Sequence, residues 1–160
     1  MSTSLSVTWD LSGQDGAETA VAGSASSGLT TGLLARSSDL VAATGTGSIN
    51  STGFPIGTSL DPTVGYYTFT VAPAPGCTLV LSNASIDTQT SAEGPAAVVL
   101  ATSVDGFAQV TSLTPTSVNT PTLAVSAATE IEVRVFGYAA TTTTGSMRIE
   151  NTLTLVGALH

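Results

Sequence analysis

The chain has 160 residues, and its eleven acidic and three basic side chains give a formal net charge of −8. A nucleic-acid interface needs a basic stripe that displaces counterions, so this balance excludes nucleic-acid binding and disfavours anionic membranes. The length fits one domain, residues 1–160, in which we expect Met1 and His160 to be additions to the native sequence. No segment has the apolar length of a membrane span, so membrane insertion is not expected.

The first third of the chain predicts three short strands. Apolar and polar residues alternate from Leu5 to Leu11, the period of a strand with one buried face, and Trp9 lies on that face. Residues 18–25 predict a second strand. A third is expected over residues 28–36, with inward side chains at Leu29, Leu33 and Leu34. Residues 37–46 fit either a helical turn or an edge strand, and residues 45–55 indicate a loop.

The middle of the chain has three β-rich runs separated by turns. In the first run, Tyr67, Phe69 and Val71 are predicted to face the core, while Tyr66 faces the other way. The second run follows Cys77, which we expect to be a small buried hydrophobe. The third run is nearly continuous in apolar residues, as in a strand covered on both faces. The turn before it, residues 91–95, gives a structural role to Gly94 and Pro95.

A third turn is predicted at Asp105, Gly106 and Phe107, because Asp-Gly favours a tight connection between strands. We expect Asp105 to cap backbone N–H groups of the turn, Gly106 to supply a positive φ and Phe107 to fill the core. Further on, residues 131–135 alternate cleanly. Their polar face carries Arg134, for which we expect an acidic partner on a neighbouring strand.

These elements predict an all-β protein of about ten short strands without βαβ crossovers. The fold class is an antiparallel β-sandwich, jelly-roll-like.

Six segments in fixed order carry a resemblance to known proteins. They are Trp9; Tyr67 to Val71 with Pro73 to Gly76; Ser91 to Pro95; Ser103 to Phe107; Arg134 to Tyr138; and Asn151 to Gly157. Together they resemble a family of exported bacterial proteins, many of which carry a PEP-CTERM sorting tail. The resemblance covers most of the chain and implies an extracellular β-sandwich similar to lectin-like and carbohydrate-binding modules. The export signal and Pro-Glu-Pro anchor of that family do not occur in this sequence.

Catalysis is not expected. A nucleophilic triad needs a base, usually histidine, and the only histidine is His160. The clusters of histidine and cysteine that hold catalytic zinc are missing. The acidic residues fall in turns or on outward faces of strands, which argues against a glycosidase pair.

Calcium is the one cofactor that the sequence leaves open. Asp10, Asp15 and Glu18 surround the first turn, and Glu150 lies in the closing strands. Carboxylate oxygens suit calcium, and a jelly roll brings its first and last strands together. The alternative is that these acids are solvated surface groups and that the protein holds no cofactor.

Two functions from different classes follow. The first is a non-catalytic structural or adhesion module of a bacterial surface or matrix, extracellular and self-associating, because no lysine protects its edge strands. The alternative is a carbohydrate-binding, lectin-like module with optional structural calcium. Its glycan-binding candidates are Tyr66 and Tyr138, which lie off the apolar register or at a strand end.

Overall fold

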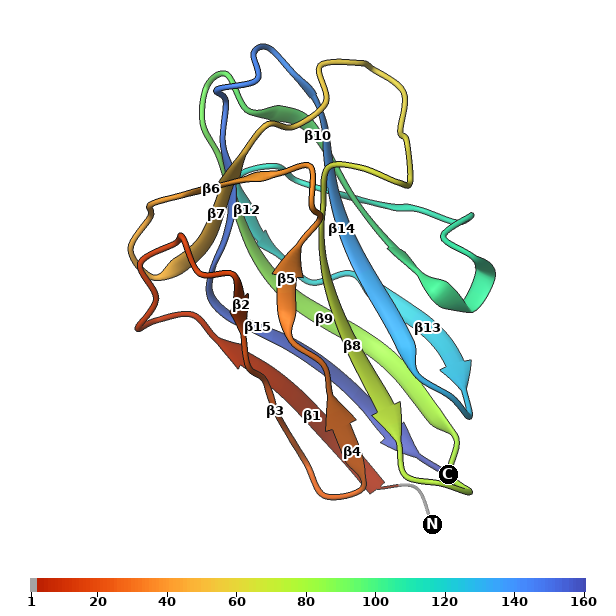
Figure 1. The fold of residues 1–160 in the computed structure, drawn as a ribbon. Helices are drawn as coiled ribbons and strands as arrows, with labels where there is room; N and C mark the ends of the chain where they lie inside the picture. The colour runs from red at the N-terminus through yellow and green to blue at the C-terminus, as the bar shows by residue number, and fades with distance from the viewer. Residues whose placement is uncertain (1–2) are drawn as a thin grey trace.

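The computed structural model describes residues 3–160, and within this range the chain forms fifteen strands and one short 3-10 helix (Figure 1). Seven of the strands have only two or three residues, which is why the sequence predicted about ten. The elements are β1 Thr3–Asp10, β2 Ala20–Val21, β3 Ser24–Ala25, β4 Leu29–Thr31, β5 Leu34–Arg36, β6 Val41–Ala43, β7 Ser48–Thr52, β8 Tyr66–Pro73, β9 Leu79–Thr90, β10 Pro95–Thr102, η1 Ser103–Asp105, β11 Thr111–Leu113, β12 Ser117–Asn119, β13 Thr122–Ala127, β14 Ile131–Ala140 and β15 Met147–Leu159.

The strands form two antiparallel sheets. In sheet A, β1, β15 and β9 are consecutive, and β12 and β13 both pair with β9. In sheet B, the order is β8, β14, β10 and β11. If β12 and β13 are counted as one strand, the strands just named can be numbered one to eight in chain order. The order across sheet A is then 1-8-3-6, and the order across sheet B is 2-7-4-5. This is the strand order of a jelly roll, so the predicted antiparallel β-sandwich is confirmed.

The core forms where the period-two pattern predicted it. Tyr67, Phe69 and Val71 on β8 are fully buried, as are Ile131 and Val133 on the neighbouring β14. Strand β10 is covered on both faces, as its continuous apolar sequence indicated, because alternate residues join the main core and a smaller cluster outside sheet B.

Trp9 is the largest side chain of the core and is fully buried. Its ring meets Phe69 edge to face, with the centroids 5.0 Å apart, and its indole N–H donates to the carbonyl oxygen of Gly32 at 3.1 Å. A Cβ atom at Gly23 would lie 2.6 Å from the indole nitrogen, so the segment between β2 and β3 passes Trp9 where only glycine fits. Trp9 is therefore held both by packing and by a hydrogen bond.

The tyrosine hydroxyl of Tyr67 is also buried and is fully satisfied. It lies 2.6 Å from the carbonyl oxygen of Met147 and 2.9 Å from Oγ of Ser51. A carbonyl can only accept, so the phenol donates to Met147 and the Ser51 hydroxyl supplies the proton of the second bond. Burial raises the pKa of Tyr67 far above its ordinary value, so this hydroxyl stays neutral.

Between β1 and β8 the chain adds β2 to β7, and Arg36 ties this insertion together. Its Nη1 donates to the carbonyl of Glu18 at 2.7 Å, and its Nη2 donates to the carbonyls of Gly16 and Asn50 at 3.2 and 3.1 Å. Its Nε donates to Ser51 Oγ at 2.9 Å. All four acceptors are neutral, so the guanidinium acts as a hydrogen-bonding clamp between the first turn and β7.

Three local predictions were wrong, two of them in this insertion. Residues 45–55 are not a loop, because β7 pairs with β15 and buries Ile49, although its polar sequence shows no strand-like alternation. Leu33 does not face inward but is 58% exposed, since it precedes the buried Leu34 and the two point to opposite faces. Cys77 is only half-buried, in the turn before β9.

No helix among the described residues is long and apolar enough to span a membrane.

Candidate functional site

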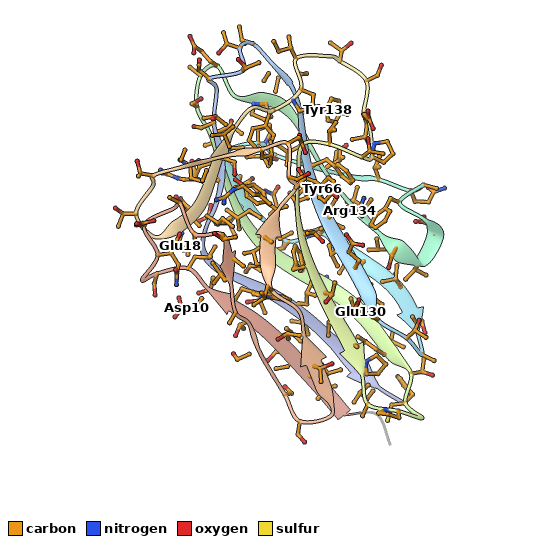
Figure 2. The ribbon with its side chains drawn as sticks, in the orientation of Figure 1. Asp10, Glu18, Tyr66, Glu130, Arg134 and Tyr138 are labelled. Carbon is orange, nitrogen blue, oxygen red and sulfur yellow. The ribbon has the colours of Figure 1, made fainter. Side chains whose placement is uncertain are left out.

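An aromatic cluster lies on the outer face of sheet B, away from the main core. Phe136 is its buried centre, and the ring of Tyr66 lies 5.4 Å from it, centroid to centroid. Tyr138 and Phe107 pack against the same cluster, as does Leu60 from the loop before β8. The structure therefore brings Tyr66 and Tyr138, the two predicted ligand-binding residues, to one face of one sheet (Figure 2).

Arg134 crosses this cluster and fills part of it. Its guanidinium carbon lies 4.3 Å from the centroid of Tyr66 and 4.1 Å from that of Phe107, within cation–π range of both rings. Its Nε donates to Glu132 Oε1 at 2.6 Å, and its Nη1 donates to the carbonyl of Pro62 at 3.0 Å. Because Arg134 covers one face of the ring of Tyr66, that face is not free for a stacking sugar.

The partner of Arg134 differs from the expected one. The partner is Glu132, two residues away on the same strand. The two side chains can meet because residues at that spacing point to the same face of a strand. Glu132 also accepts from the hydroxyl of Thr68 on β8 at 2.8 Å, so the pair still links two strands.

In the turn at Asp105, two of the three residues have their predicted roles and Phe107 does not. Asp105 accepts from the backbone N–H groups of Ala108 and Gln109 at 3.2 and 3.0 Å, and Gly106 has a φ of 68°, as predicted. The connection is longer than a tight hairpin, because η1 precedes Gly106 and Phe107 also has a positive φ, of 63°. Phe107 is therefore half-buried over Arg134 rather than in the main core.

The turn over residues 91–95 interlocks with the loop before β15. The backbone N–H of Ser91 donates to the carbonyl of Ser146 at 3.0 Å, and the N–H of Ser146 donates to Oγ of Ser91 at 2.9 Å. A Cβ atom at Gly94 would collide with the carbonyl oxygen of Ser146, and Pro95 begins β10. These contacts give Gly94 and Pro95 positions that fit their predicted structural role.

Of the predicted calcium ligands, Asp10 ends β1, Asp15 and Glu18 lie in the loop between β1 and β2, and Glu150 lies near the start of β15. Strands β1 and β15 are neighbours, as expected, and Asp10 is paired with Thr152. Asp15 Oδ1 accepts from the N–H of Ala17 at 2.9 Å, and the carboxylate of Glu18 accepts from the N–H groups of Asp15 and Gly16. Glu150 contacts Arg148.

Within residues 3–160, no three side chains of histidine, cysteine, aspartate or glutamate form a group that could hold a metal. Figure 2 shows Asp10 and Glu18 apart from the aromatic cluster. Calcium binding at these acids stays a prediction.

Asp10 has a depressed pKa, with a local cause that can be tested. Hydrogen bonds from the hydroxyl and the backbone N–H of Ser12 lower the pKa of this exposed carboxyl. A pKa lower in the folded than in the unfolded chain means that these bonds favour folding above the ordinary pKa of about 3.9. Their contribution is lost as the pH falls through the folded pKa.

Replacing Ser12 with alanine keeps the N–H and removes the hydroxyl, so we expect the Asp10 pKa to rise toward its ordinary value. An NMR titration of the side-chain carboxyl carbons measures it. Asp61, whose pKa is lowered in the same way by Thr63, is the internal control and should not change. An unchanged Asp10 pKa in S12A would contradict the assignment.

Two surface hollows complete the candidate sites, and the sequence pointed to neither. One, of about 70 Å³, opens between the edges of the two sheets and is lined by Leu100, Ala101, Thr102, Asp105, Gln109, Thr111, Leu123 and Val125. The other, of about 190 Å³, is lined by Gln89, Thr90, Ser91, Ser146 and Arg148. Their residues come from strands distant in the chain, so only the strand pairing reveals them.

No protein-family model and no curated protein matches the chain. Among solved structures, the chain is similar to a family two carbohydrate esterase from Cellvibrio japonicus, at 13% sequence identity and a TM-score of 0.39. The similarity covers 98% of this chain and 34% of that one, so the chain spans about a third of the length of that esterase chain. At this identity and TM-score the likeness assigns neither activity nor substrate.

Proposed function

We propose that the protein is a non-catalytic structural or adhesion module of a bacterial surface or extracellular matrix, and that it associates with further copies of itself. The contact would be the side of the sandwich where β11 and β13 end the two sheets. One observation carries this proposal. Leu123 and Val125 line the smaller hollow there, and the exposed Val104 and Val110 are next in sequence to residues that line it; we call these four residues the apolar side.

Exposure supports a role for the apolar side in association. Val104 and Val110 are 45% and 46% exposed, and each adjoins a residue that lines the hollow. Leu123 and Val125, inside the hollow, are half-buried. Grouped exposed aliphatic residues are typical of protein contact sites.

Charge favours a second copy as the occupant. Residues 106–129, which build β11, β12 and β13, contain no charged side chain, and Asp105 is the one charged residue that lines the hollow. Two molecules of net charge −8 repel each other, and this repulsion is weakest where the facing surfaces carry few charges. Self-association through the apolar side should therefore be stronger at 0.5 M than at 0.05 M salt, because salt screens the remaining acids.

The outer edge of sheet A argues for side-chain packing rather than continuous strand addition. Pro121 lies between β12 and β13 and cannot donate a backbone hydrogen bond. Ala124, with a φ of 52°, forms a bulge where the pairing of β13 with β9 shifts. Proline and bulges are devices that block edge pairing, so this lysine-free edge is protected by other means.

We expect light scattering after size-exclusion chromatography at about 100 µM protein to give a mass above that of the 15.8 kDa monomer. V110K places a charge on the apolar side and should return the mass to that of the monomer. V41K is the matched control, because Val41 is 60% exposed on β6, in a different part of sheet A. A monomeric wild type at high salt, or equal effects of both variants, would refute the proposal.

Glycan binding is the second candidate function, and one observation favours it. Tyr66 and Tyr138 share the cluster around Phe136, and Tyr138 is half-exposed at the strand end. Aromatic rings held by packing at a surface suit stacking on a sugar ring. Tyr138 is the stronger of the two candidates, because Arg134 covers one face of the ring of Tyr66.

A further inference from the structure

The three arginines of the chain differ in what their guanidinium groups contact. Arg36 donates to four oxygen atoms, and Arg134 is held by a carboxylate, a carbonyl and two aromatic rings. Among the described residues, Arg148 makes one polar contact, in which its Nε lies 2.8 Å from Oε2 of Glu150. The alignment does not meet that of a hydrogen bond, so the buried Nε has no hydrogen-bond partner.

The fold places Arg148 on the outer face of sheet A. Met147 and Ile149, its neighbours in β15, are fully buried, so Arg148 points outward by the alternation of the strand. It is paired with Gln89 on β9 and with Asn50 on β7. Its side chain is 39% exposed, so part of it reaches solvent although Nε is buried.

The larger hollow lies beside this arginine. Besides Arg148, its lining is polar and uncharged, and consists of Gln89, Thr90, Ser91 and Ser146. Ser91 Oγ accepts from the N–H of Ser146, which leaves its own hydroxyl proton for another acceptor. Arg148 has further N–H donors at Nη1 and Nη2, and neither atom donates to any described residue. The N–H groups at Nη1 and Nη2 are therefore available to a ligand in the hollow.

The available N–H groups of the guanidinium fit a carboxylate. The planar fork of arginine matches the two carboxylate oxygens, and such charge-assisted bonds are stronger than neutral ones. The surrounding carboxamide and hydroxyl groups both donate and accept, which suits the hydroxyls of a sugar ring. The hollow is open to the surface, so a unit within a longer chain has room to enter it.

We propose that this hollow binds the carboxylate of one uronate residue of a polysaccharide, with Arg148 as the principal contact and Gln89 as a second, a local contact made against the net charge of −8. This site is separate from the apolar side and from the tyrosines of sheet B. Nearby carboxylates are already engaged. Glu150 contacts Nε of Arg148, and Asp87 accepts from Asn151 at 2.6 Å and from Gln89 at 3.3 Å.

The test uses the full chain and an oligogalacturonate as the probe, with a neutral galactose oligomer of equal length as the control ligand. Calorimetry gives the affinity, and NMR amide shifts give the location, expected around Gln89, Ser91 and Arg148. R148Q should weaken binding about tenfold or more, because it removes a charge-assisted bidentate contact. R148K should weaken it less, since it keeps the charge and loses the fork. Q89A should give a smaller loss than R148Q.

The folding of R148Q is not at risk, because a partly exposed ion pair adds little stability. Y138A is the matched control for location. If Y138A abolishes binding and R148Q leaves it unchanged, the sugar binds at the aromatic cluster and the present proposal is overturned. Equal affinity for the neutral oligomer, or no binding of the oligogalacturonate, overturns it as well. If acetate bound as tightly as the oligogalacturonate, the carboxylate alone would account for binding, and the proposal that a sugar is recognised would be refuted.

Discussion

Replacing Trp9 with alanine is expected to lower the free energy of unfolding by about 4 kcal/mol, the usual range for a large aromatic residue in a core. The variant loses the edge-to-face contact with Phe69 and leaves the carbonyl of Gly32 without its indole donor. For a chain of this length, the midpoint of thermal unfolding should fall by roughly 10 °C. Urea unfolding followed by circular dichroism measures the free energy directly.

Two further variants separate the causes of this loss. W9F keeps an aromatic ring and loses the indole N–H, so it should cost less than W9A. V156A removes an exposed aliphatic side chain from the central strand β15 and should change stability little. If W9A cost no more than V156A, Trp9 would not be central to the core.

Replacing Arg36 with methionine should cost about 3 kcal/mol, because it removes four hydrogen bonds to partly buried acceptors on two segments, the first turn and β7. The same change at Arg148 is the matched control. That arginine has one ion pair and no hydrogen bond, so R148M should cost at most about 1 kcal/mol.

Hydrogen exchange locates the effect of R36M. Faster exchange is expected first at amides that depend on the clamp, such as the N–H of Asn50, which donates to the carbonyl of Gly16. Equal losses of stability in R36M and R148M would show that the four hydrogen bonds of Arg36 contribute nothing beyond a surface charge.

The alternation of apolar residues was sufficient to predict the sandwich. Trp9, Phe69 and Val133 each sit in a run with period two, and in a sheet with one buried face that period alone decides which side chains point inward. Strand β7 was not predicted, because its sequence lacks this alternation. Its sequence is mostly polar, and Ser48, Asn50 and Ser51 are buried because β7 pairs with β15, not because they are apolar.

The candidate sites depend on pairing between distant strands. Tyr66 and Tyr138 could be singled out because they break the apolar register, but their common cluster follows from the order of β8 and β14. Arg148 gave no signal beyond being one of three arginines. Its hollow forms only when β9 and β15 pair and bring Gln89 beside it. Periodicity is local information, whereas these sites are set by register across the sheet.

The position of β15 has a consequence for how the protein is made. This strand pairs with β1, β7 and β9, and joins residues as distant as Thr3 and Leu159. Because ribosomes add residues from the N-terminus, these three strands wait without their common neighbour until residues 147–159 have emerged. Loop closure over such separations is slow, so sheet A assembles late. Sheet A can therefore reach its final pairing only after residues 147–159 have left the ribosome.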